Sequence, residues 1–122
     1  MTKRILVIED TEDNRQIVRD LLTSAGYDLI EAVDGEAGVE MAAKEKPDLI
    51  LMDIQLPILD GYEATRRIKA DAALASVPII AVTSYALAGD EAKTRAAGCD
   101  AYIAKPFSPR QLLAKVRELL PE

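Results

Sequence analysis

Leu49-Ile50-Leu51-Met52-Asp53 is an apolar run that ends on a carboxylate, and the rest of the chain is organised around it. Because the run is short, apolar and bounded by Pro47 and Pro57, it predicts a strand buried on both faces, as strands of parallel sheets are. An ionised carboxylate in the middle of such a strand would be costly, so we expect Asp53 at the strand's exit. In open α/β folds this carboxyl edge of the sheet is where ligands bind.

A second apolar run, Ile5-Leu6-Val7-Ile8, also ends in acid, at Glu9 and Asp10. Two buried strands that deliver carboxylates to the same edge of a sheet form an acidic pocket. That pocket is the candidate site.

The composition is that of a small globular protein: 122 residues, of which 49% are hydrophobic and 30% charged. We expect residues 1–122 to form one domain with no attached output domain. The net charge of −6, without a cluster of basic residues, disfavours binding to nucleic acid or to anionic lipid. The apolar runs are shorter than the roughly 20 residues of a membrane span, so no membrane insertion is expected. The single cysteine, Cys99, fits a reducing cytoplasm.

The chain contains no histidine. This excludes catalysis by histidine, metal binding through imidazole and Ser-His-Asp triads. The side chains left for chemistry are carboxylates, hydroxyls and lysine. The chain also cannot carry a phosphohistidine of its own.

Apolar runs alternate with stretches of helical periodicity along the chain. Strands are expected at 4–8, 28–32, 49–53, 77–82 and 101–104, and helices at about 11–25, 34–46, 60–70, 87–97 and 108–120. Five such units predict an α/β fold, (βα)5, with a doubly wound five-stranded parallel sheet and helices on both faces. For the first and third strands to be neighbours, the order should be 2-1-3-4-5, which is taken from flavodoxin-like folds.

Three of the helix starts carry capping signals. Thr11 is expected to cap the first helix, Asp60 and Glu63 fit a reciprocal cap, and Ser108 with Gln111 fits a capping box. The expected apolar faces are Ile17, Val18, Leu21, Leu22 and Ala25 in the first helix, and Ala37, Val39, Met41, Ala42 and Ala43 in the second.

Polar residues follow four of the predicted strands. Glu9 and Asp10 follow the first strand, Asp53 ends the third, Thr83 follows the fourth and Lys105 follows the fifth. Each alone could cap a turn or face solvent. Together, at successive strand ends, they favour one site at the carboxyl edge.

Three carboxylates in one pocket repel one another. At about 4 Å and an effective dielectric constant near 20, each pair costs on the order of 4 kcal/mol. Lys105 offsets one charge, so a hard cation such as Mg²⁺, Mn²⁺ or Ca²⁺ is expected as well. The hydroxyl of Thr83 and the ammonium of Lys105 suit the oxygens of a phosphoryl group, which makes Asp53 the candidate nucleophile for an aspartyl-phosphate.

The motif set resembles the CheY-like receiver domain of two-component response regulators over essentially the whole chain. The motifs are Ile8-Glu9-Asp10, Leu51-Met52-Asp53-Ile54-Gln55-Leu56-Pro57, Asp60-Gly61, Val82-Thr83-Ser84 and Lys105-Pro106-Phe107. Within that family, Ile50 to Pro57 and Gly98 to Ile103 are most similar to free-standing single-domain regulators of the DivK type.

The resemblance implies that Asp53 is phosphorylated by the phosphohistidine of a histidine kinase or a histidine phosphotransfer protein. It implies Mg²⁺, or Mn²⁺ in its place, bound by Glu9, Asp10, Asp53 and the backbone carbonyl of Gln55. It also implies slow self-dephosphorylation rather than classical enzyme activity. Many receivers have Asp where this chain has Glu9, which leaves open whether Glu9 binds the metal directly or through water. A cis bond before the proline of the Lys105-Pro106 pair is implied too.

In the family a threonine moves toward the phosphoryl group and an aromatic residue on the fifth strand swings inward. Thr83 and Tyr102 match these positions, so the face of the fourth helix, fifth strand and fifth helix is expected to bind a downstream protein. Gln55 and Tyr85, each two residues beyond a site residue, are expected to screen the phosphoryl group from water.

Three other functions fit less well. A phosphatase of the dehalogenase type wants a second Asp where this chain has Gln55. A flavodoxin needs a phosphate-binding loop where residues 9–13 are acidic. A receiver that only binds partners would not need the complete site.

Overall fold

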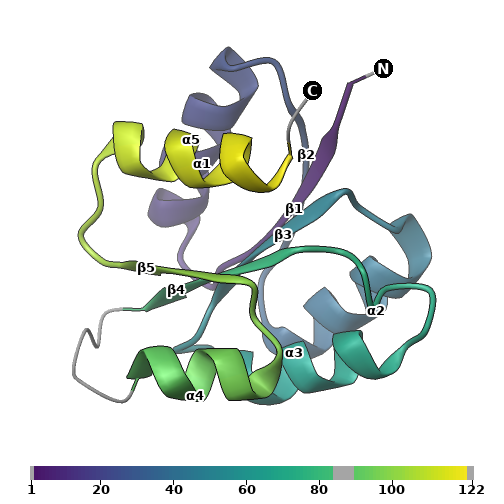
Figure 1. Ribbon diagram of the computed structural model, residues 1–122. Coiled ribbons are helices and arrows are strands. Elements are labelled where there is room, and N and C mark those ends of the chain that lie inside the picture. The colour runs from purple at the N-terminus through teal and green to yellow at the C-terminus, as the bar shows by residue number, and fades with distance from the viewer. Residues whose placement is uncertain (1, 84–89, 121–122) are drawn as a thin grey trace.

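The computed structural model describes residues 2–83 and 90–120. Its sheet consists of five parallel strands in the order β2-β1-β3-β4-β5, as predicted (Figure 1). The strands are β1 (Arg4–Ile8), β2 (Asp28–Ala32), β3 (Leu49–Asp53), β4 (Ile79–Thr83) and β5 (Ala101–Ala104). The helices are α1 (Glu12–Ser24), α2 (Gly35–Glu45), α3 (Gly61–Ala70), α4 (Asp90–Ala97) and α5 (Pro109–Leu119).

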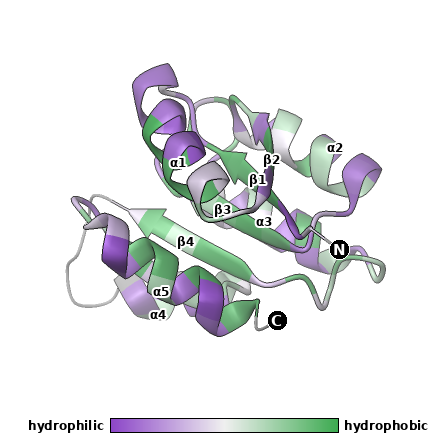
Figure 2. Cartoon of the chain, turned by 90° about the horizontal axis from the view of Figure 1, so that it is seen from above, coloured by the Kyte–Doolittle hydropathy of each residue, from purple (hydrophilic) through white to green (hydrophobic). Residues whose placement is uncertain are grey.

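The sheet is covered on both faces, by α1 and α5 on one side and by α2, α3 and α4 on the other (Figure 1). Successive residues of β1 therefore face different layers. Ile5 and Val7 pack in the core with α1 and α5, whereas Leu6 and Ile8 pack with α2 and α3. The strands inside are largely apolar, and the outer surfaces of the helices are polar (Figure 2). Burial on both faces explains why β1 and β3 are continuously apolar.

The predicted helix caps are only partly correct. Ser108 and Gln111 form the complete capping box of α5. Asp60 accepts from the N–H of Glu63, but the Glu63 carboxylate pairs with the arginines at 66 and 67 and so does not complete a reciprocal cap. Thr11 lies at the N-cap of α1 without a side-chain capping bond, and its N–H donates to the carboxylate of Glu9.

The predicted apolar faces also need correction. Ile17 is 59% exposed, because the inward face of α1 is formed by Arg15, Val18 and Leu22. Ala43 of α2 is exposed as well, while Gly38 is buried against the side chain of Ile8.

The boundaries of two elements differ from the predicted ones. β4 starts at Ile79, two residues later than expected, and it includes Thr83. The α4 helix is described from Asp90, so the predicted start at 87 lies outside the described residues. Among the helices of residues 2–83 and 90–120, none has both the length and the apolar character needed to cross a membrane.

Candidate functional site

Three carboxylates meet at the carboxyl edge of the sheet. Asp53 ends β3 and is 4% exposed, and Glu9 directly follows β1 and is 6% exposed. Asp10, the next residue, is exposed to solvent. One oxygen of each carboxylate lies within 4.8 Å of the others. The structure thus brings together the acidic residues that the sequence places at two different strand ends.

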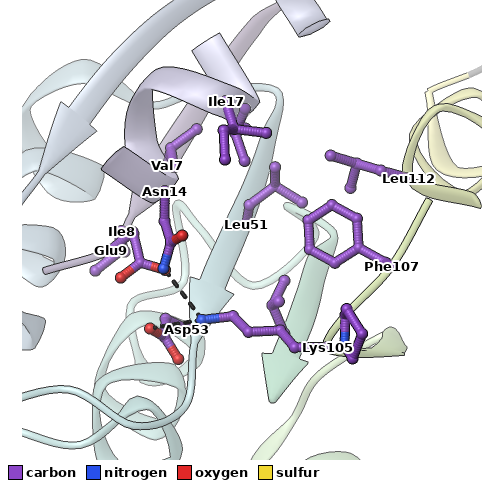
Figure 3. Close-up of a pocket in the computed structure, with 13 residues that line it drawn as sticks. Val7, Ile8, Glu9, Asn14, Ile17, Leu51, Asp53, Lys105, Phe107 and Leu112 are labelled. Atoms are coloured by element: carbon purple, nitrogen blue, oxygen red, sulfur yellow. Dashed lines mark hydrogen bonds and ion pairs between the residues drawn. The ribbon is translucent and has the colours of Figure 1, made fainter. Parts of the chain in front are cut away.

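Lys105 reaches this cluster from the end of β5. Its ammonium Nζ lies 3.1 Å from Glu9 Oε1 and 3.3 Å from Asp53 Oδ2 (Figure 3). The sequence predicts that Lys105 offsets one carboxylate charge and suits the oxygens of a phosphoryl group, and in the structure it pairs with two carboxylates. The cis bond between Lys105 and Pro106 is confirmed.

The surroundings of Asp53 disfavour its charge. Burial is the largest cause and the negative charge of Glu9 the next, and together they raise the pKa of Asp53 from 3.8 to about 6. Lys105 and the N–H of Gln55 act in the opposite direction but do not compensate. The pKa of Lys105 is raised: burial lowers it, but the charges of Asp53 and Glu9 outweigh that effect.

Glu9 and Asp10 respond in opposite directions. Burial favours the neutral form of Glu9, but hydrogen bonds from the Thr11 N–H and from Asp10, together with Lys105, lower its pKa. The hydrogen bond that Asp10 shares with Glu9 raises the pKa of Asp10. Glu9 is thus the acid that stays ionised most readily. Its negative charge contributes to the raised pKa of Asp10 and of Asp53.

Gln55 links the acidic cluster to Thr83. Its main-chain N–H donates to Asp53 Oδ1 over 3.0 Å, and its side-chain amide donates to the hydroxyl of Thr83 over 2.8 Å. Thr83 is fully buried at the end of β4. The sequence reasoning expected the main-chain carbonyl of Gln55 to bind the metal and Gln55 to screen the phosphoryl group from water. It did not anticipate the hydrogen bond between the side chains of Gln55 and Thr83.

Tyr102, expected to take part in the switch, and Tyr85, expected to screen the phosphoryl group, are described to different extents. Tyr102 is half-buried on β5, where it pairs in register with Ala81 of β4. Thr83 pairs two residues further on, with Ala104. Tyr85 lies outside the described residues, so its screening role stays a prediction.

The donor set fits a divalent hard cation. Three carboxylates with oxygens this close, one of them buried with a raised pKa, gain most from a doubly charged ion that takes oxygen ligands. Glu9, Asp10 and Asp53 are the residues that would hold Mg²⁺ or Mn²⁺.

A cavity of about 460 Å³ adjoins the acidic cluster. Glu9, Asp53 and Lys105 lie at its polar end, while Ile17 and Phe107 line the part between α1 and the start of α5 (Figure 3). Asp53 thus lies at the wall of a cavity. The sequence pattern predicts Ile17 on the buried face of its helix, whereas in the structure it lines this cavity.

Arg15 is a residue near the site that the sequence reasoning missed. Its guanidinium donates to the main-chain carbonyl of Glu9 over 2.7 Å, although it lies on α1. The available signal was its spacing, because Arg15 stands three residues before Val18 and seven before Leu22, on the buried stripe.

Comparison with known proteins identifies this arrangement. The family described as "Response regulator receiver domain" matches residues 5–117. The chain belongs to this receiver family. It is 42% identical over 120 residues to the polar-differentiation response regulator DivK of Brucella ovis, with 98% of each chain covered.

Solved structures agree with this assignment. The receiver domain of sensor histidine kinase PA1611 from Pseudomonas aeruginosa PAO1 is 38% identical, with a TM-score of 0.92 and 100% of each chain covered. That crystal structure has a magnesium ion coordinated in the active-site cleft. Chemotaxis protein CheY4 of Vibrio cholerae is 26% identical, with a TM-score of 0.93 over 98% of this chain and 99% of that one. The predicted CheY-like receiver fold is confirmed.

Proposed function

We propose that this receiver accepts a phosphoryl group from a partner's phosphohistidine onto Asp53, and that the phosphorylated form binds a downstream protein. The observation that carries the proposal is Asp53 itself, a buried carboxylate at the end of the central strand, between two further acids and Lys105. Membership of the receiver family and similarity to DivK support a role in two-component signalling.

The transfer needs a nucleophile and an ordered environment. A carboxylate oxygen of Asp53 attacks phosphorus, an O–P bond forms, and the P–N bond to the donor histidine breaks as the imidazole leaves with the electron pair. The N–H of Gln55 holds Asp53 Oδ1, which fixes the orientation of the carboxylate. Lys105 then exchanges one of its carboxylate contacts for an oxygen of the bound phosphoryl group.

Mg²⁺ bound by Glu9, Asp10, Asp53 and the carbonyl of Gln55 supplies positive charge that offsets the charge on these oxygens. The magnesium ion in the PA1611 receiver supports this assignment. Glu9 is held by both Lys105 and the N–H of Thr11, so both direct and water-mediated binding by Glu9 remain part of the proposal.

These 122 residues contain no histidine, so the donor histidine lies outside them. A histidine kinase or a histidine phosphotransfer protein fits, as expected for relatives of DivK.

The switch is proposed to start at Thr83. Its hydroxyl now accepts from the Gln55 amide, so a move toward a phosphoryl group on Asp53 breaks that bond and forms a new one. Tyr102 lies on the neighbouring strand β5 and is half-buried, and in this proposal it turns inward. The face formed by α4, β5 and α5 changes as a result, and the downstream protein binds there.

Phosphotransfer from a labelled phosphohistidine protein tests the proposal. We expect label on the wild type in the presence of Mg²⁺, lost on treatment with hydroxylamine as an acyl phosphate is, and none on Asp53→Asn. Stable label on Asp53→Asn, or label resistant to hydroxylamine, would contradict the assignment. Unchanged backbone amide shifts in α4, β5 and α5 after phosphorylation would contradict the proposed face.

A further inference from the structure

We propose that Arg15 is a positioning residue for the metal site, because it holds the peptide that joins Glu9 to Asp10. The inference rests on the proposed function, since it concerns the carboxylates assigned there to Mg²⁺. Arg15 itself would not touch the ion.

The side chain of Arg15 is buried and makes three polar contacts. Nη1 donates to the carbonyl oxygen of Glu9 over 2.7 Å, Nη2 lies 2.5 Å from Glu12 Oε2, and Nε lies 3.3 Å from Glu31 Oε1. The side chain is 10% exposed. The flat guanidinium can offer several donors in fixed directions, so one side chain connects the end of β1, the start of α1 and β2.

The contact with Glu9 orients both neighbouring acids. The N–H of Glu9 donates to the carbonyl of Ala32 on β2 over 3.1 Å, so Arg15 completes the main-chain hydrogen bonding of this residue. The carbonyl of Glu9 shares a rigid peptide plane with the nitrogen and Cα of Asp10. Holding that plane therefore sets the direction from which the exposed Asp10 carboxylate approaches Asp53.

The charge and the position of Arg15 have opposite effects on a bound cation. A positive charge this close to the ligands repels Mg²⁺, although Glu12 and Glu31 offset part of it. Removing the charge alone should tighten Mg²⁺ binding. Releasing the Glu9–Asp10 peptide should weaken it, so the sign of the change distinguishes the two effects.

Arg19 is a matched control on the same helix. Its guanidinium pairs with the same two acids, Glu31 at 2.7 Å and Glu12 at 3.1 Å. Its hydrogen bonds within the described residues go to these carboxylates and not to Glu9. A variant at Arg19 disturbs the same acids without releasing the Glu9 carbonyl.

The experiment is calorimetric titration of the purified protein with Mg²⁺ alone, with folding checked by circular dichroism. The variants are Arg15→Met, which keeps the apolar stem, Arg15→Lys and Arg19→Met. Loss of a group that orients metal ligands costs about 10- to 100-fold in metal affinity, so we expect Arg15→Met to bind Mg²⁺ at least about tenfold more weakly. Arg19→Met should stay within about twofold of the wild type, and Arg15→Lys should lie between.

Each result decides the proposal. Folded Arg15→Met with unchanged or tighter Mg²⁺ binding overturns it, and so does an equal loss in Arg19→Met. If Arg15→Met does not fold, Arg15→Lys decides: weaker binding supports the role and unchanged binding overturns it. A wild type that binds no Mg²⁺ contradicts the proposed function, whereas normal wild-type binding with unaffected variants contradicts only the role of Arg15.

Discussion

The surroundings of Asp53 disfavour its ionised form relative to its neutral form. Asp53 is buried beside Glu9, and its pKa is raised to about 6 even though Lys105 and Gln55 stabilise the ionised form. The same features that prepare this carboxylate for a cation and a phosphoryl group therefore lower the stability of the metal-free protein at neutral pH.

We predict that Asp53→Asn is more stable than the wild type in the absence of metal. Below pH 4 both the folded and the unfolded state hold the Asp53 proton, so the residue costs nothing. Between about pH 4 and pH 6 the unfolded chain has released this proton while the folded state still holds it, so the free energy of unfolding falls over this range and levels off above it. About two pKa units correspond to a cost on the order of 2–3 kcal/mol, so Asp53→Asn should melt several degrees higher at pH 8.

Thermal melts from pH 4 to pH 8, in the presence of a chelator, measure this difference. The gain should shrink as the pH falls toward 4. Asp20→Asn, a change at an exposed acid on α1, is the control and should show little gain. A gain that is independent of pH would contradict the explanation.

Ile58 is under backbone strain. It has a φ of 71°, and the N–H of Leu59 donates to the carbonyl of Pro57 over 2.7 Å, which closes a tight turn around it. A β-branched residue rarely adopts this conformation, and the side chain of Ile58 is 77% exposed, so packing offers little compensation.

We predict that Ile58→Gly raises the free energy of unfolding by about 1 kcal/mol, because relief of strain exceeds the added freedom of the unfolded chain. Urea denaturation measures the change. Ile58→Ala keeps the Cβ and should gain less. Equal gains in both variants would point to the side chain rather than to the backbone.

At the scale of elements, α2 approaches β1 closely through Gly38. A Cβ placed on Gly38 would lie 2.5 Å from Cδ1 of Ile8 and within 3.0 Å of two more of its side-chain carbons. Ile8 directly precedes Glu9, so crowding here acts on the strand end that carries the site.

We predict that Gly38→Ala lowers the free energy of unfolding by about 1–3 kcal/mol, although alanine is the better helix former. Ile8→Val removes the nearest carbon, so the double variant should lose less than the sum of the two single changes. Urea denaturation of the four proteins completes this cycle. Additive losses would show that the two residues do not press on each other.

The elements themselves were largely predictable, because hydrophobic pattern and strand ends are local properties of the sequence. β1, β2, β3 and β5 start and end at the predicted residues. The corrections concern partners that only folding brings together. Thr11 makes no side-chain capping bond, and its N–H donates to Glu9. The carboxylate of Glu63 pairs with two arginines instead of completing a cap. Position 38 has no space for a Cβ, because the side chain of Ile8 lies opposite.

The candidate site, too, was predictable only in part. The acids, Thr83 and Lys105 were predictable, since parallel strands must end at one edge. The contact between Gln55 and Thr83, the pairing of Lys105 with both acids and the burial of Arg15 depend on side-chain directions. A sequence pattern does not specify those directions.

At the scale of the whole molecule, the site ties together elements from both ends of the chain. Lys105 joins β5 to Glu9 beyond β1 and to Asp53 on β3. A ligand bound by the acids should therefore stabilise the entire fold, since it binds the folded state and not the unfolded chain.

We predict that the melting temperature rises with the Mg²⁺ concentration, by an amount that corresponds to about 2.7 kcal/mol at a concentration one hundred times the dissociation constant. Asp10→Asn and Asp53→Asn should lose most of this rise, and Asp20→Asn should keep it. Scanning calorimetry at several Mg²⁺ concentrations measures the effect. An equal rise in all four proteins would show that the ion acts on the net charge of −6 and not at the site.

The central claim is that Asp53 accepts a phosphoryl group with the help of Mg²⁺. Intact-mass spectrometry after incubation with acetyl phosphate tests it most directly, on the wild type and Asp53→Asn, with Mg²⁺ and with a chelator. We predict a mass increase of one phosphoryl group in the wild type with Mg²⁺, and in none of the other three samples. A phosphoryl adduct on Asp53→Asn, or one that forms equally well with the chelator, would contradict the account.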